Sequence, residues 1–328
     1  MKPVVLRWGL LSTARINRAL IPPLRASRRN LLSAVASRSL EKAQTYAKEW
    51  GIPKAYGSYE ALLADTEIDV VYNSLPNNLH AEWTIKALHA GKHVLCEKPL
   101  ALSLDDVDAV IAAAQETGFH AVEAFMYRFH PQASAVKEMV ERGVVGKVQL
   151  IRGAFTYLLN RPGDVRLKPE LGGGSIWDVG CYPINYARYI AGVEPVEVYG
   201  WQVIGETGID DTFIGQMRFP DDIFAQFHSS FRLSHTSLVE ITGTEAKIII
   251  PQPYKPGKRP VIMLERGGES QKVRVPGELL YLGEVEDMAD VILKGAKPRI
   301  PLEDTRNNTA VLLALLQSAR EGKPVFLK

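Results

Sequence analysis

The stretch Arg7-Trp8-Gly9-Leu10-Leu11-Ser12-Thr13-Ala14-Arg15-Ile16-Asn17 decides the fold of the chain. It joins an apolar run at residues 4–11, which predicts a β-strand, to an amphipathic stretch at residues 16–26, which predicts an α-helix. A dinucleotide-binding domain needs small residues in such a turn, so that main-chain N–H groups and the helix N-terminus reach a pyrophosphate. The glycine pattern GxGxxG appears here as Ser12-x-Ala14-x-x-Asn17, which a plain strand–turn–helix would also accommodate. The segments that follow therefore decide between the two interpretations.

Strand and helix patterns alternate through the first third of the chain, which predicts parallel βαβ units with helices on both faces of a sheet. We expect this part to form a Rossmann dinucleotide-binding domain at residues 1–123. After residue 124 a helix follows Pro131, and a series of strands with short connections indicates antiparallel pairing. The fold class is therefore α/β, with a second α/β domain at residues 124–328 built on a large, mostly antiparallel open sheet. The predicted strands are 4–11, 31–36, 70–73, 93–95, 120–124, 148–155, 196–203, 212–219, 223–231, 238–242 and 247–250, and the predicted helices are 16–26, 40–50, a short one ending at 61–64, 80–90, 104–117, much of 175–190, 285–294 and 304–321.

The end of the second predicted strand indicates which nicotinamide cofactor binds. An NAD-binding chain usually places Asp or Glu here for the ribose hydroxyls, whereas this chain has Ser37 and Arg38. The guanidinium of Arg38 can hold a 2′-phosphate with two hydrogen bonds, and Lys42 lies one helical turn further on. We therefore expect NADP(H) as the preferred cofactor and NAD(H) as a second option. The turn residues expected to bind the dinucleotide are Ser12, Thr13, Ala14, Arg15 and Ile16.

A second group of candidate residues follows the fourth and fifth predicted strands, at the strand ends where open α/β sheets bind ligands. A lysine directly after a buried strand, such as Lys98, is costly unless it reaches a pocket or a partner, and Pro99 keeps it extended. Lys98 therefore either points into a site or forms a local ion pair with Glu97. His80 is expected to be a pocket or capping residue rather than a base. The residues that we assign to the cofactor here are Ser74, Leu75, Pro76, Asn77, His80, Glu97 and Lys98.

A run of three glycines at residues 172–174 opens the third candidate segment and gives a ligand room to approach the main chain. Asp178 and Tyr182 are four residues apart, which predicts that they share a helix face, and Pro183 is expected to kink that helix. A free tyrosine has a pKa of about 10, so Tyr182 needs a nearby cation, such as Lys98, to exchange protons near neutral pH. Taken one at a time, these residues also have purely structural interpretations. Tyr182 could be an interfacial aromatic residue, Asp178 a charge at a helix N-terminus and Trp177 a core residue.

The ordered set of these segments, together with Phe125-Met126-Tyr127-Arg128-Phe129-His130-Pro131, resembles the glucose–fructose oxidoreductase/inositol dehydrogenase/MocA family over essentially the whole chain. The resemblance implies hydride transfer between a nicotinamide and a carbon bearing a hydroxyl or carbonyl, usually on a sugar or polyol. Lys98 falls on the family's catalytic lysine and Asp178 on its substrate-side aspartate. Many members have histidine where this chain has Tyr182. A tyrosine at this position resembles the branch with glucose–fructose oxidoreductase, xylose dehydrogenase and dihydrodiol dehydrogenase, in which tyrosine is the expected acid/base. The departures from the family pattern are Ser12 and Ala14 in place of glycines.

The resemblance implies a division of roles between these residues. Tyr182 takes the hydroxyl proton, Lys98 stabilises the phenolate and the developing alkoxide, and Asp178 and Arg128 orient substrate hydroxyls. Trp177 is expected at the substrate, and Arg128 is expected to contact the cofactor as well. Alternatives within the family are a ketosugar or anhydrosugar reductase and a dihydrodiol dehydrogenase. A non-enzymatic alternative is an NADP-sensing regulatory protein.

The composition excludes several other classes of function. The 328 residues carry 39 basic and 37 acidic side chains, so a net charge of +2 gives no reason to expect nucleic acid or membrane as a partner. No apolar stretch approaches the roughly 20 residues that span a bilayer, and two cysteines outside any CxxC pair suit a reducing, cytoplasmic location. The histidines lack metal-ligand spacing, so no metal site is expected. An open sheet needs its exposed face covered, which predicts a homodimer or homotetramer through the C-terminal sheet.

Overall fold

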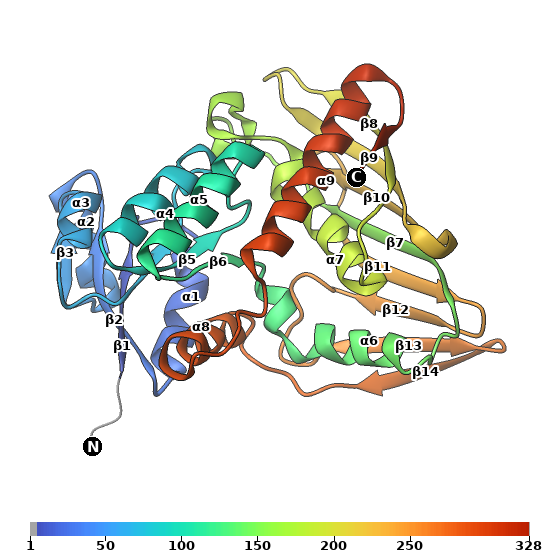
Figure 1. Ribbon diagram of the computed structural model, residues 1–328, viewed down its shortest axis with the longest axis horizontal. Helices are drawn as coiled ribbons and strands as arrows, with labels where there is room; N and C mark the ends of the chain where they lie inside the picture. The colour runs from blue at the N-terminus through green and yellow to red at the C-terminus, as the bar shows by residue number, and fades with distance from the viewer. Residues whose placement is uncertain (1–4, 328) are drawn as a thin grey trace. The chain divides into compact units, whose positions relative to one another are not determined.

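The computed structural model describes residues 5–327 and divides them into two compact units (Figure 1). The first unit comprises the described residues up to Phe129 together with Tyr281–Arg306. The second unit comprises His130–Leu280 and the described residues from Asn307 onward. The expected division at residue 123 assigns residues 281–306 to the second domain, whereas here they belong to the first compact unit.

The first unit is built on a six-stranded parallel sheet with the strand order β3-β2-β1-β4-β5-β6. The order reverses between β1 and β4, so the loops that follow these neighbouring strands lie side by side at one edge of the sheet. One face carries a core of buried residues from α3, α4 and α5, such as Leu62, Leu88 and Val107. The elements of this unit are β1 (Leu6–Leu10), α1 (Asn17–Ala26), β2 (Asn30–Ala36), α2 (Leu40–Trp50), β3 (Lys54–Tyr56), α3 (Tyr59–Leu63), β4 (Val70–Asn73), η1 (Asn77–Leu79), α4 (His80–His89), β5 (His93–Glu97), α5 (Leu104–Thr117), β6 (Ala121–Ala124), η2 (Met126–Phe129), α8 (Leu282–Lys294) and the first residues of α9 (Leu302–Glu321).

Helices of the first unit begin and end where the sequence supplies local caps. The side chains of Ser39, Ser58 and Ser103 each accept a main-chain N–H at the start of α2, α3 and α5. Gly51 and Gly118 end α2 and α5 in the left-handed conformation that glycine adopts without steric cost. Because these caps are local, the predicted helices 40–50 and 104–117 coincide with α2 and α5.

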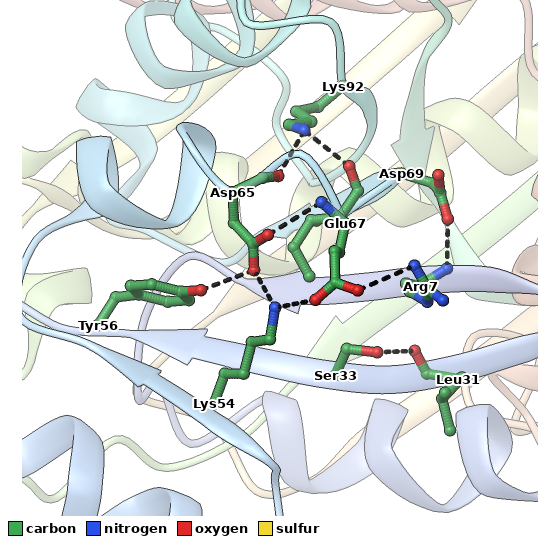
Figure 2. A network of polar contacts seen from close by, with 10 residues as sticks. Arg7, Leu31, Ser33, Lys54, Tyr56, Asp65, Glu67, Asp69 and Lys92 are labelled. Carbon is green, nitrogen blue, oxygen red and sulfur yellow. Dashed lines mark hydrogen bonds and ion pairs between the residues drawn. The ribbon is translucent and has the colours of Figure 1, made fainter.

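A polar network lies at the other end of the same sheet, where its strands begin (Figure 2). Lys54 at the start of β3 donates to Asp65 at 2.7 Å and to Glu67 at 2.5 Å, and the Tyr56 hydroxyl donates to Asp65 at 2.6 Å. Buried Lys92, just before β5, donates to the main-chain oxygen of Asp65 at 2.7 Å. Burial by itself raises the pKa of Asp65, but the hydrogen bonds from Lys54 and Tyr56 lower it to about 2. The network lies at the amino ends of the strands and is structural.

The second unit is built on a nine-stranded mixed sheet with the order β14-β13-β12-β11-β7-β10-β9-β8-β15. All its pairs are antiparallel except β7 with β10. Helix α7 packs on the face formed by β7 and β10. The elements are α6 (Pro131–Glu141), β7 (Val148–Thr156), η3 (Val165–Leu167), η4 (Pro169–Leu171), η5 (Ile176–Gly180), α7 (Cys181–Ala191), β8 (Glu197–Ile204), β9 (Asp210–Arg218), η6 (Pro220–Asp222), β10 (Phe224–Ser230), β11 (Thr236–Gly243), β12 (Lys247–Pro251), β13 (Val261–Arg266), β14 (Glu269–Arg274), the rest of α9 and β15 (Val325–Phe326).

The two sheets confirm the predicted fold class: a parallel Rossmann-type sheet and a large, mostly antiparallel one. The sequence patterns did not predict β3, β13, β14 and β15. β3 and β15 are short and β14 is mostly polar, whereas the apolar run that opens β13, residues 261–264, was a strand signal that was missed. The predicted helix at 175–190 is present, but its first part, η5, is a π-helix. Among the described residues, no helix is long and apolar enough to cross a membrane.

Candidate active site

The turn after β1 is joined to the turn after β4 by a chain of side-chain hydrogen bonds. The Ser12 and Ser74 hydroxyls are 2.8 Å apart, and Ser74 donates to the side-chain oxygen of Asn17 at 2.7 Å. Since the Ser74 proton is used on Asn17, Ser12 is the donor to Ser74. The Asn17 amide donates back to the main-chain oxygen of Ser12 at 2.7 Å. Asn17, fully buried where the family pattern has glycine, thus closes the turn with its own side chain.

The missing glycines at Ser12 and Ala14 have a simple explanation in the backbone. Neither residue has a positive φ, so the turn does not need the left-handed conformation that favours glycine. The side-chain oxygen of Ser12 accepts the Ala14 N–H at 3.0 Å, which holds the turn in place. Helix α1 starts without a side-chain cap, and the main-chain amides of Arg15 and Ile16 donate to no group among the described residues. Those amides fit the anion-binding role expected of this turn.

The residues expected at the 2′-phosphate lie after β2. Ser37 is buried, whereas Arg38 and Lys42 are exposed. Arg38 lies near the Tyr59 hydroxyl, whose pKa is raised by burial and lowered to a smaller extent by Arg38. No acidic residue occupies the end of β2, so the charge at this strand end is positive. The residues present therefore fit a phosphate better than a ribose hydroxyl pair.

The turns after β4 and β5 meet at His80, the first residue of α4. Its Nδ1 lies 2.7 Å from the main-chain oxygen of Pro99, and its Nε2 lies 2.7 Å from that of Leu75. Lys98, half-buried, directly precedes Pro99 through a cis peptide bond. Of the residues expected at the cofactor, Ser12, Ser74, Leu75, His80 and Lys98 are therefore brought together at one edge of the sheet. His80 takes part through main-chain contacts, with its ring buried.

The sequence patterns did not predict a buried cluster of acidic and phenolic side chains around Glu97, which consists of Tyr72, Tyr281 and Glu284. The Tyr72 hydroxyl donates to Oε1 of Glu97. Glu284, the third residue of α8, is fully buried, and neither of its carboxyl oxygens has a hydrogen-bond partner among the described residues. Burial, followed by the charge of Glu97, raises the pKa of Glu284 well above its ordinary value. Burial and Glu97 also raise the pKa of Tyr281, so this hydroxyl keeps its proton at neutral pH.

Arg128 lies in η2 and is buried, 8% exposed. Its Nη1 forms an ion pair with Asp304 at 3.1 Å, and its main-chain oxygen accepts from Arg299 at 3.5 Å. Arg128 therefore helps to fix the segment at 299–304 to the first unit. Whether it also contacts cofactor or substrate stays a prediction.

Asp178 of the second unit lies in the π-helix η5 and is held by two side chains that the sequence patterns did not single out. The Tyr157 hydroxyl donates to its Oδ2 at 2.7 Å, and Nε of Arg166 lies 2.9 Å from the same oxygen. Arg166 also contacts Asp164 at 3.1 Å. Asp178 raises the pKa of Arg166, so the guanidinium remains charged. The aspartate that is expected on the substrate side therefore contacts a cation and a phenol of its own unit.

The glycine run has a different function from the one expected. A Cβ at Gly173 would lie 2.5 Å from the main-chain oxygen of Arg166, and one at Gly174 would lie 2.2 Å from Oδ1 of Asp210. Glycine is required here because the chain's own segment at residues 166–168 packs against the run, and Gly174 has φ +128°. Buried Asp210 accepts from the Ser175 hydroxyl at 2.7 Å and from the Ile176 amide at 2.8 Å. The run thus places Arg166 at Asp178.

Tyr182 is buried, 4% exposed, in the first turn of α7. Its ring centroid lies 5.5 Å from that of Phe155 and 5.6 Å from that of Tyr254. Trp177 is also buried. An i→i+5 turn replaces the α-helical turn between Asp178 and Tyr182, so the expected four-residue spacing on one α-helical face does not apply. Such π-turns are frequent at functional sites.

Two family models match the chain. The model described as "Oxidoreductase family, NAD-binding Rossmann fold" matches residues 6–125, and the "GFO/IDH/MocA C-terminal domain" matches residues 133–249. The chain is 35% identical to D-xylose 1-dehydrogenase (NADP(+)) 2 of Haloferax volcanii, over 98% of this chain and 99% of that protein. It is also 35% identical to trans-1,2-dihydrobenzene-1,2-diol dehydrogenase of Xenopus laevis, over 75% of each.

A solved structure gives the same result for the fold. A 3-ketoreductase from Actinomadura kijaniata, determined in complex with NADP and TDP-benzene, matches with a TM-score of 0.91. The identity is 28%, and the match covers 96% of this chain and 98% of that one. The match therefore includes both units, each with its sheet.

Proposed function

Because the chain belongs to the GFO/IDH/MocA family of oxidoreductases, we propose that it transfers a hydride between NADP(H) and a sugar or polyol carbon bearing a hydroxyl or carbonyl group. The observation that carries the proposal is the hydrogen-bonded edge of the first unit, where Ser12, Ser74, Leu75 and Lys98 follow neighbouring strands. This edge presents unbonded amides for a pyrophosphate and a lysine for the reacting oxygen. NADP, when bound, supplies a nicotinamide that accepts or gives the hydride.

The preference for NADP is supported by the residues after β2 and by the relatives. Arg38 and Lys42 are exposed cations at this strand end, and Ser37 replaces the acid that favours NAD. The related xylose dehydrogenase carries NADP(+) in its name, and the 3-ketoreductase was solved with NADP. NAD(H) lacks the 2′-phosphate that Arg38 would bind, so we propose it as the weaker cofactor.

We assign acid/base catalysis to Tyr182 and electrostatic assistance to Lys98. In oxidation, the substrate hydroxyl gives its proton to Tyr182 while the hydride leaves the same carbon, which becomes a carbonyl; reduction reverses both transfers. Lys98 would stabilise the phenolate and the negative charge that develops on the substrate oxygen. Asp178, held by Tyr157 and Arg166, would accept hydrogen bonds from neighbouring substrate hydroxyls. Trp177 and Arg128 are proposed as further substrate contacts.

A test of this assignment compares two tyrosines of α7. Tyr182→Phe is expected to lower kcat by about 10² to 10⁴ while leaving the Kd for NADP within about twofold. Tyr189→Phe, which removes a half-buried hydroxyl from the same helix, is expected to keep kcat near the wild-type value. Equal kcat values in the two variants would remove Tyr182 from the acid/base role.

We also propose that the exposed face of the second-unit sheet joins copies of the chain into a homodimer or homotetramer. Trp201, Val203, Ile214 and Phe224 project from this face, each between 46% and 50% exposed. Exposed apolar side chains of this size on one sheet face are typical of protein interfaces. Light scattering of the double variant Trp201→Glu/Ile214→Glu is expected to show a smaller assembly than the wild type, and an unchanged mass would refute the proposal.

Two buried free cysteines, Cys96 and Cys181, support a reducing compartment such as the cytoplasm.

A further inference from the structure

His80 is a buried histidine whose two ring nitrogens both face hydrogen-bond acceptors. Nδ1 lies 2.7 Å from the main-chain oxygen of Pro99, and Nε2 lies 2.7 Å from the main-chain oxygen of Leu75. Main-chain oxygens cannot donate, so each contact requires an N–H on the ring. A neutral imidazole has a single N–H, and its other nitrogen would point a lone pair at an oxygen lone pair. Only the doubly protonated ring satisfies both contacts.

The length of the two contacts supports the charged form. Neutral N–H···O bonds cluster near about 2.9 to 3.0 Å, whereas bonds from charged nitrogen donors shorten to about 2.7 to 2.9 Å. Both contacts of His80 fall at the short end. The ring is only 1% exposed, so water cannot replace either partner.

The surroundings of the His80 ring both raise and lower its pKa. Burial, and to a smaller extent the charge of Lys98, lowers the pKa of His80 to about 4, although its two main-chain partners raise it. Burial thus opposes the ionised ring, and the assignment of two protons rests on the two acceptor contacts, which a neutral ring cannot both satisfy. On β5, burial raises the pKa of Cys96 well above its ordinary value, so this thiol is neutral. On β6, the carboxyl group of buried Glu123 accepts the Leu100 amide at 2.9 Å, one residue beyond Pro99. The acids of α5, Asp105, Asp106, Asp108 and Glu116, are exposed.

The two partners of His80 belong to the two turns that carry the proposed site. Leu75 follows Ser74, which is bonded to Ser12 in the turn expected at the pyrophosphate. Pro99 follows Lys98 directly. The side chain of His80 therefore links the turn after β4 to the turn that carries Lys98. The Asn73 side chain donates to the main-chain oxygen of His80 at 2.9 Å and holds the histidine itself in place.

We propose that His80 is a positioning residue that joins the cofactor turn at Leu75 to the turn that carries Lys98, and that it does so as an imidazolium. The proposal rests on the proposed function for its kinetic consequences, but not for the protonation state. Loss of either N–H frees one turn from the other. The cost then appears in NADP affinity if Leu75 is freed, and in kcat if Pro99 and Lys98 are freed.

The first test is nitrogen NMR of the wild-type protein labelled at its histidines, at pH 7 and without substrate. The His80 resonances, assigned by their absence from His80→Gln or by ring-to-backbone correlation if that variant is insoluble, are expected to show protons on both ring nitrogens. A ring with one protonated and one unprotonated nitrogen at pH 7 would overturn the proposal. This result does not depend on catalysis, so it stands even if no sugar is turned over.

The second test is kinetic and uses matched variants. His80→Gln keeps one side-chain amide donor group, and His80→Leu keeps none. We expect NADP Kd and kcat to worsen by at least about tenfold in His80→Leu, with partial rescue in His80→Gln. His89→Leu, an exposed histidine at the other end of α4, is the control and is expected to match the wild type. If a folded His80→Leu protein keeps both NADP Kd and kcat at wild-type values, His80 has no positioning role.

Discussion

The guanidinium of Arg166 pairs with the carboxylate of Asp178, with Nε 2.9 Å from Oδ2. Tyr157 donates to the same oxygen at 2.7 Å, so the carboxylate is held from two sides. The segment that carries Arg166 packs against the glycine run through Gly173 and Gly174. A sugar hydroxyl that approaches Asp178 would therefore meet a carboxylate with a fixed orientation.

Replacing this arginine is expected to weaken sugar binding. Arg166→Met removes the cation that pairs with the Asp178 carboxylate, so KM for the sugar should rise by about tenfold. KM for NADP should stay unchanged, because Arg166 pairs with Asp164 and Asp178, neither of which is expected at the cofactor. Arg161→Met, an exposed arginine of the same loop, serves as the control. A sugar KM equal to that of the control variant would show that Asp178 does not depend on Arg166.

Arg38 is expected to discriminate between the two nicotinamide cofactors. Arg38→Ala should raise the Kd for NADP by about 10- to 100-fold and leave that for NAD nearly unchanged, because only NADP has the 2′-phosphate. Arg28→Ala removes an equally exposed cation at the opposite end of β2 and should change neither affinity. Fluorescence titration with both cofactors measures the ratio directly. A similar loss for NADP and NAD would contradict the assignment.

Acid should weaken the network around Asp65 over a defined range. The folded-state pKa of Asp65 is about 2, against an ordinary value of 3.8. Its contribution to stability is therefore fully present above about pH 4 and is lost as the pH falls towards 2. Asp65→Asn removes this titration, so the free energy of unfolding should depend less on pH between 4 and 2 than in the wild type. Urea unfolding at several pH values checks this, with Glu41→Gln on the exposed side of α2 as the control.

Glu284 should lower the stability of the folded chain as the pH rises, which is the opposite of the effect of Asp65. Burial raises the pKa of its carboxyl, so the folded chain holds this proton to a higher pH than the unfolded chain, which releases it near the ordinary value of 4.5. Rising pH above about 4.5 therefore favours the unfolded chain, by up to about 1.4 kcal/mol for each pH unit. Glu284→Gln cannot release a proton, so its stability relative to the wild type should increase from pH 5 to pH 8. Parallel pH profiles for the two proteins would show that Glu284 is ionised when folded.

Much of the fold was predictable because its determinants are local. Ser39 and Gly51 mark both ends of α2, and the turn residues Pro220-Asp221-Asp222 lie between the antiparallel strands β9 and β10. Three-residue β3 was missed because Lys54-Ala55-Tyr56 is too short to show a period. The parallel pair of β7 and β10 depends on contacts between distant segments, which local patterns do not encode.

The candidate site divides in the same way. Strand-end residues such as Ser74 and Lys98 were predictable because their position follows from the strands alone. Glu284 is far from Glu97 in sequence, and only tertiary packing brings the two side chains close enough for the charge of Glu97 to act on Glu284. Arg166 had no motif of its own, although the adjacent glycine run was a signal that the chain itself approaches closely there. Lys98 and Tyr182 belong to different units, and their partnership stays a prediction.

The most direct test of hydride transfer to NADP is a turnover screen that follows NADPH absorbance with aldoses, polyols, trans-dihydrodiols and ketosugars in both directions. We predict turnover of at least one sugar or polyol, faster with NADP than with NAD, and abolished in Lys98→Met although that variant still binds NADP. Tight NADP binding with no turnover of any compound in either direction would contradict the account and favour a cofactor-sensing protein.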